Sequence, residues 1–167
     1  MKLSRPLLPL LIIVLAAMVS LSGCDYFASK TLKPGVSTES EVRALMGRPE
    51  LVWAEEDGTR VLEYPRAPTG HDTYMVTIGP DGKFVAMENM LTQERFEQIK
   101  AGMTRDQVRR MLGKPSEIEF FTLSRQEVWS FKHIGEMSDS DMFNVHFDMM
   151  GIVLKMTVTR DPQYDNA

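Results

Sequence analysis

The side chains that could do chemistry in this 167-residue chain are few and scattered. Its three histidines, His71, His133 and His146, include no pair at the i, i+4 spacing that places two metal ligands on one helix face. The polar run at residues 138–141 holds two aspartates but lacks the other ligands of a calcium loop. No serine or cysteine lies in a pattern that supplies a base and an oxyanion site. We therefore expect no catalytic residue, no metal site and no cofactor, and hence a protein that is not an enzyme.

Methionine is unusually abundant, with 13 residues. Thioether sulfur binds Cu(I), and the methionines at 137, 142, 149 and 150 lie near two of the histidines in the sequence, so copper handling is one hypothesis. Methionine also fills gaps in ordinary cores and is common on surfaces that bind proteins. Several other methionines fall on predicted core faces, which favours the second interpretation.

The single cysteine, Cys24, ends a segment that has the features of a secretion signal. Lys2 and Arg5 precede an almost continuous apolar run over residues 7–21, which is short for a membrane-spanning helix. A transmembrane anchor is the alternative interpretation. The sequence Leu21-Ser22-Gly23-Cys24 resembles a bacterial lipobox, which implies cleavage before Cys24 and acylation of its thiol and new amino group.

Cleavage there would leave a signal peptide at 1–23 and a lipidated tether at 24–31. The whole chain carries 19 basic and 23 acidic residues, and the part after the signal carries 17 and 23. This acidity argues against a nucleic-acid partner. Thirteen residues separate Cys24 from Thr38, a reach of at most about 45 Å, so the following residues should lie close to the membrane.

An internal repeat organises the rest of the chain. In each copy a threonine and the Glu or Gln three residues later predict a capping box, and an apolar stripe follows at helical spacing. A glycine then ends the helix and a proline prevents its return. The residues of this structural motif are Gly35, Thr38, Gly47 and Pro49 in the first copy and Gly102, Thr104, Gly113 and Pro115 in the second.

Alternating apolar residues predict strands after each short helix. The predicted strands are 50–53, 61–64, 73–78 and 83–89 in the first copy and 117–121, 127–133, 142–147 and 152–159 in the second. On the last strands we expect Val85 and Met87, and then Leu154, Met156 and Val158, to share one face. An extra helix is expected at 92–100, with a short counterpart at 26–32.

These elements predict an α+β fold of two tandem two-layer units, each a helix pair packed on a three- or four-stranded antiparallel sheet. The first repeat would span 32–91 and the second 92–161, with a tail at 162–167. A sequence of this length can bury a core without disulfides.

The second copy carries a more specific resemblance. Residues 99–104, the run Leu112-Gly113-Lys114-Pro115, Trp129 and residues 145–153 together resemble the SmpA/OmlA, or BamE, family of lipoproteins. The resemblance implies a helix-helix-sheet domain behind a lipidated cysteine that belongs to the machinery assembling outer-membrane β-barrels. The best-known members have one such domain and this chain has two, which leaves a different partner open. The tandem arrangement also resembles the β-lactamase-inhibitor-protein architecture.

The leading hypothesis is therefore a non-enzymatic envelope lipoprotein that binds or scaffolds other proteins, in outer-membrane β-barrel assembly. It would be held at the outer membrane by acylated Cys24 and face the periplasm, although Asp25 directly after the cysteine is typical of inner-membrane retention in enteric bacteria. The alternatives are a periplasmic inhibitor or binding protein of β-lactamase-inhibitor-like architecture and a copper or lipid-headgroup binder.

The predicted partner-binding residues are Lys132, His133, Glu136 and Met137. They lie in a loop that is two residues longer than its counterpart in the first copy, and insertions in a repeat tend to fall on functional loops. We expect the turn to leave all four exposed, and we expect Phe131 beside them to be a core residue.

Overall fold

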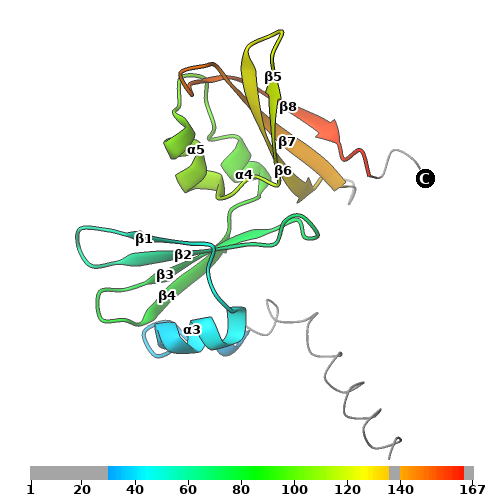
Figure 1. The fold of residues 1–167 in the computed structure, drawn as a ribbon. Coiled ribbons are helices and arrows are strands. Elements are labelled where there is room, and N and C mark those ends of the chain that lie inside the picture. Colours follow the sequence, from blue (N-terminus) through cyan, green and yellow to red (C-terminus); the bar gives the residue numbers. More distant parts are fainter. Residues whose placement is uncertain (1–29, 136–139, 164–167) are drawn as a thin grey trace, which may run out of the picture.

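The computed structural model describes residues 30–135 and 140–163, which form an α+β fold with two four-stranded antiparallel sheets (Figure 1). The first half contains α3 (Glu39–Met46), β1 (Leu51–Ala54), β2 (Arg60–Pro65), β3 (Thr73–Ile78) and β4 (Phe84–Asn89). The second contains α4 (Gln93–Phe96), α5 (Arg105–Leu112), β5 (Glu117–Phe121), β6 (Gln126–Ile134), β7 (Ser140–Phe147) and β8 (Val153–Arg160). In both sheets the strands pair in chain order. Within this part of the chain, no helix is long and apolar enough to cross a bilayer.

The helices α3 and α5 begin and end in the same way. The hydroxyl of Thr38 accepts the backbone N–H of Glu41, whose carboxylate accepts the N–H of Thr38 in return. Thr104 and Gln107 make the same reciprocal pair at the start of α5. Each box satisfies backbone donors that an eight-residue helix would otherwise leave free. Such short helices depend on packing for most of their stability.

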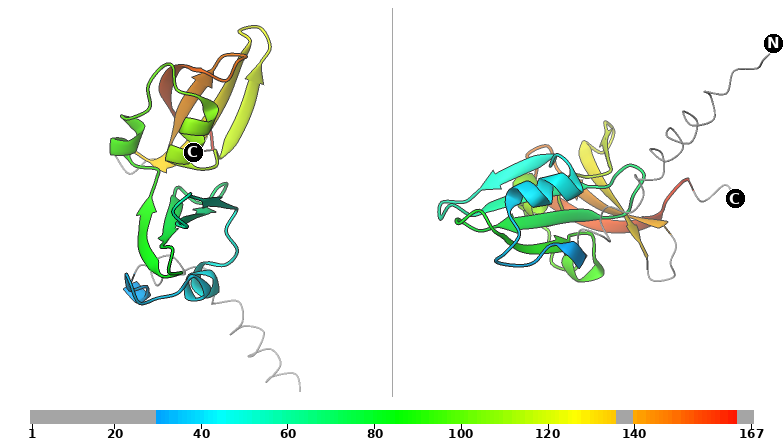
Figure 2. Two further views of the ribbon diagram at one scale, coloured as in Figure 1. Left: turned by 90° about the vertical axis from the view of Figure 1, so that its left-hand side faces the viewer. Right: turned by 90° about the horizontal axis from the view of Figure 1, so that it is seen from below.

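Each sheet has its own hydrophobic core. Val42 and Met46 of α3 pack with Leu62, Tyr64 and Val76 of the first sheet. The second core joins α4 and α5 to the second sheet, through Phe96, Ile99, Val108, Leu112, Trp129, Phe131, Phe143, Val145 and Phe147. The layers therefore follow the order α3, first sheet, α4 with α5, second sheet, as Figures 1 and 2 show. Phe131 is fully buried, as the sequence predicts.

The last strand of each sheet differs from the sequence-based prediction at a bulge, and on β8 Val158, predicted on the same face as Met156, is also exposed. The pairing register shifts at Ile78 and at Phe147, so that Phe84 and Val153 take the buried positions. Val85 and Leu154, predicted to start the inward face, are exposed instead. A β-bulge inserts one extra residue and so changes which side chains face the core. Met87 and Met156, beyond the bulges, pack against the cores as expected.

The extra helix is shorter than expected. The α-helical part ends at Phe96, and the N–H groups of Gln98 and Ile99 bond to carbonyls three residues back, which tightens the final turn. Phe96 and Ile99 nevertheless point into the core. Most of the expected counterpart at 26–32 lies outside the described residues.

Candidate binding surface

The face of the first sheet that turns away from α3 is covered by the end of α5. Glu63, in the middle of β2, is fully buried there. Its Oε1 accepts a hydrogen bond from the Arg109 guanidinium at 2.5 Å and another from the backbone N–H of Lys114 at 2.6 Å. A carboxylate on the first sheet thus holds the C-terminal end of a helix from the second half.

Gly113 allows this close approach. Its φ is +81°, a backbone conformation that residues with a Cβ rarely adopt. A Cβ added there would lie 2.5 Å from Thr73 Cγ2, 3.1 Å from Glu63 Oε1 and 3.3 Å from Met75 Cε. The helix end therefore seats against three neighbouring positions of the first sheet, Glu63, Thr73 and Met75.

Basic side chains extend this contact along the edge formed by β1. Lys114 Nζ lies 2.6 Å from Glu50, and Arg110 lies 3.0 Å from Glu55. The Arg110 guanidinium also stacks 4.6 Å from the centre of the Trp53 ring. These partly exposed pairs each contribute less than a buried pair would, but they give the contact a clear charge pattern.

Burial makes Glu63 electrostatically unusual. Loss of water around its carboxyl group outweighs the attraction of Arg109 and raises the pKa to about 7. Its second oxygen, Oε2, is buried and has no hydrogen-bond partner in the part of the chain that the structure describes. A proton on that oxygen would relieve the cost of burying a charge.

The equivalent face of the second sheet is open. The equivalence follows from hydrogen bonds: the N–H of Glu50 bonds to the carbonyl of Glu63 at 2.8 Å, and the N–H of Ser116 bonds to that of Ser130 at 2.8 Å. Ser130 thus corresponds to Glu63. Because Glu63 pairs with Met75 and Ser130 with Asn144, Asn144 corresponds to Met75, and by the same register Met142 corresponds to Thr73.

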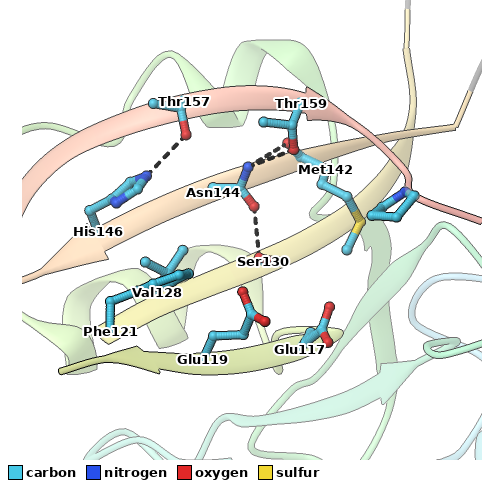
Figure 3. Close-up of a pocket in the computed structure, with 11 residues that line it drawn as sticks. Glu117, Glu119, Phe121, Val128, Ser130, Met142, Asn144, His146, Thr157 and Thr159 are labelled. Atoms are coloured by element: carbon cyan, nitrogen blue, oxygen red, sulfur yellow. Dashed lines mark hydrogen bonds between the residues drawn. The ribbon is translucent and has the colours of Figure 1, made fainter. Parts of the chain in front are cut away.

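These positions line a hollow of about 260 Å³ on the open face (Figure 3). Ser130 donates to Asn144 Oδ1 at 2.7 Å, and Asn144 donates to Thr159 at 3.0 Å. His146 lies 3.0 Å from the Thr157 hydroxyl, and burial lowers its pKa, so it is neutral near pH 7. Glu117 and Glu119 border the hollow on β5.

The chemistry of this hollow is suited to binding. Its hydroxyl and amide groups are hydrogen-bonded to each other, and its two carboxylates are exposed. Among the described residues, no three His, Cys, Asp or Glu side chains are grouped so as to hold a metal ion.

Two of the residues predicted to bind a partner are buried rather than exposed. Strand β6 continues to Ile134, so Lys132 and His133 lie within it and each is only 6% exposed. Lys132 pairs with the buried Asp161 at 2.6 Å, and the His133 ring packs 4.7 Å from that of Phe96. The expectation that both are exposed is wrong, because Lys132 pairs with Asp161 and the His133 ring packs against Phe96. Glu136, Met137 and Cys24 lie outside the described residues.

Glu63 and Arg109 were not among the residues that the sequence pattern singled out. One signal was available: Glu63 interrupts the apolar strand Val61-Leu62-Glu63-Tyr64, and a charge in such a position is rarely buried without a partner. Its partner lies 46 residues away and could not be identified from spacing.

Comparison with known proteins supports the resemblance of the second half. Residues 88–157 match the family model described as the outer membrane protein assembly factor BamE domain. This range covers α4, α5 and the second sheet as far as Thr157. No curated protein matches the chain.

Two similar solved structures are a DUF4309 family protein (YjgB) from Bacillus subtilis and a candidate β-lactamase inhibitor protein from Streptococcus mutans. The first is 12% identical over 78% of this chain and 83% of that chain, with a TM-score of 0.31. The second is 13% identical over 74% and 82%, also with a TM-score of 0.31. Likeness at this level carries no argument about the fold or the function of this chain.

Proposed function

Because residues 88–157 match the BamE domain, we propose that this protein is a non-enzymatic envelope lipoprotein that binds other proteins during outer-membrane β-barrel assembly. The match is the observation that carries the proposal. The open face of the second sheet supports it, because this face belongs to the matched region and presents two exposed carboxylates, Glu117 and Glu119, beside a hollow.

The proposal includes two copies of one unit, at 32–91 and 92–161, with a tail at 162–167. Each half has a capped eight-residue helix followed by four strands paired in chain order, which supports this division. In the second half α4 and α5 pack on the sheet together. The matching helix pair in the first half includes the helix predicted at 26–32, most of which lies outside the described residues.

The proposed membrane attachment is through Cys24, after removal of residues 1–23. The outer membrane is the proposed location, with Asp25 leaving the inner membrane as the alternative. A C24A variant should remain uncleaved or become soluble, and labelled palmitate should be absent from it. Sucrose-gradient fractionation would assign the membrane, and cofractionation with inner-membrane markers would overturn the proposed location.

Affinity purification tests the function. A tagged full-length chain is purified from detergent-solubilised envelopes, with the C24A variant as the control. Recovery of β-barrel assembly components with the wild-type chain is expected. Recovery of a periplasmic enzyme in their place would support the inhibitor alternative, and recovery of neither would contradict the proposal.

A further inference from the structure

Of the two equivalent sheet faces, the one on the first sheet is covered by the end of α5. On the first sheet, the positions of Glu63, Thr73 and Met75 receive the glycine end of α5. On the second sheet the same three positions, Ser130, Met142 and Asn144, line an open hollow. The first face therefore serves as a template for the second.

The acidic groups of both faces lie along the same edge. In the first sheet Glu50 and Glu55 flank β1 and pair with Lys114 and Arg110 at the end of α5. In the second sheet Glu117 and Glu119 lie on β5, the equivalent strand. Both are exposed, and neither has an ion pair with a residue that the structure describes. A basic group that reaches this edge would find two uncompensated carboxylates.

We infer that the open face of the second sheet binds the C-terminal end of a helix from another envelope protein, a helix with Lys or Arg in its last turn and a glycine directly after it. The glycine seats on Ser130 and Asn144, as Gly113 seats on Glu63 and Met75. The basic side chains reach Glu117 and Glu119. This inference extends the proposed function by stating the chemistry of the partner.

A second copy of this chain fits less well, although the end of α3 has a similar pattern. Gly47 follows α3 with open space around it, and Arg48 is exposed. However, α3 lies close to the proposed lipid anchor, whose tether reaches at most about 45 Å. A copy stacked on the second sheet would have its own α3 on the far side of the first copy's layers, away from the membrane (Figure 1). A helix of a different protein has no such constraint.

A peptide provides a direct test. The probe is a fluorescent peptide of residues 104–115, stapled between positions 107 and 111 to keep it helical, and titrated into the full-length mature protein in detergent. We expect saturable binding. A peptide with Gly113→Val should bind at least about tenfold more weakly, equivalent to 1.4 kcal/mol, because the close approach is lost.

Protein variants locate the binding site. E117K/E119K should weaken peptide binding by about tenfold or more. The matched control is E94K/E97K, which makes the same charge change at two exposed positions, one within α4 and one directly after it, and should change affinity less than twofold. T159W, which fills the hollow from β8 without changing charge, should also weaken binding. Circular dichroism confirms that each variant is folded. Absence of binding to the wild type, or equal weakening by both charge variants, would overturn the inference.

Site-specific photo-crosslinking identifies the natural occupant. A photoreactive phenylalanine analogue at Phe121 borders the hollow, and one at the neighbouring Phe120 points to the opposite side of β5. The Phe121 crosslink should map to a helix end with basic residues and a glycine, and the Phe120 position should not give it. A crosslink to a second copy, to lipid or to an extended acidic segment would overturn the inference. Purification without barrel-assembly components, but with such a crosslink, would contradict the proposed function alone.

Discussion

The two sheets of this protein have the same strand order and equivalent faces, but one face is covered and the other is open. The covered face has a carboxylate, Glu63, at the position where the open face has Ser130. Correspondingly, Gly113 at the end of α5 is buried against a sheet and Gly47 at the end of α3 is exposed. The difference shows that one pattern, a capped helix ended by glycine, serves as an internal contact in one place and leaves a free surface in another.

The hairpins beside these two faces also differ, because one makes an internal contact and the other is exposed. The turn after β1 contains Glu55, Glu56 and Asp57, and the first of these pairs with Arg110. The turn after β5 contains Leu123, and Phe120 and Phe121 precede it, all exposed. The acidic hairpin is used inside the molecule, whereas the apolar hairpin faces solvent next to the open hollow. Exposed apolar clusters of this kind often mark interaction sites.

Replacing the two helix-ending glycines with valine should have the largest effects on stability. Both have positive φ, at +85° for Gly47 and +81° for Gly113, so valine is strained at either. We expect G47V to lower the unfolding free energy by about 1–2 kcal/mol through strain alone. G113V adds a clash with Thr73 and should lower it by about 3 kcal/mol or more. Urea unfolding of both variants measures this, and equal effects would contradict the close approach at Gly113.

Replacing the equivalent arginines, Arg109 and Arg43, should cost less stability than replacing the glycines. R109A leaves Glu63 buried without its charged partner and should lower the unfolding free energy by about 2–3 kcal/mol, less than a fully ionised pair because the carboxyl can take a proton. R43A removes only a partly exposed pair with Glu39, worth about 0.5 kcal/mol. If both variants unfold at the same urea concentration, the Arg109–Glu63 pair stabilises the fold no more than the exposed Arg43–Glu39 pair does.

Glu63 should also make stability depend on pH. Its folded pKa, about 7, is above the ordinary glutamate pKa of 4.5, so the folded state holds the proton more tightly. The resulting stabilisation is complete below about pH 4.5 and is lost as pH rises through 7. His133 acts in the opposite direction, since burial lowers its pKa. The contribution of Glu63 is therefore measured as the difference in unfolding free energy between the wild type and E63Q, because the amide of glutamine cannot ionise.

We expect the unfolding free energy of E63Q to rise by about 2–3 kcal/mol relative to that of the wild type between pH 5 and pH 8. Denaturant unfolding at four or five pH values measures this difference. A difference that is constant with pH would show that the Glu63 pKa is unshifted.

The smallest contrast concerns the two acidic edges. E50K/E55K breaks two partly exposed ion pairs and should lower the unfolding free energy by about 0.5–1 kcal/mol. E117K/E119K breaks none of the described pairs and should change it by less than about 0.5 kcal/mol. A large loss of stability in the second variant would indicate that these carboxylates serve the fold rather than a partner.

Features that depend on nearby residues follow from the sequence alone. The capping boxes at Thr38 and Thr104, the turn glycines and the strands at 73–78 and 117–121 all reflect contacts within a few residues. The same local patterns carry the BamE resemblance of residues 88–157. They were predictable because capping, turn conformation and side-chain alternation need little knowledge of the rest of the chain.

Features that depend on distant contacts were decided only by the tertiary structure. The bulges at Val85 and Leu154 arise from pairing between strands, and the burial of Lys132 and His133 arises from their contacts with Asp161 and Phe96. The contact of Glu63 with Arg109 joins residues 46 positions apart. No spacing rule predicts which face a helix from one half will cover in the other, because that choice depends on complementary shape and charge across two surfaces. That choice determined which sheet face is buried and which is open.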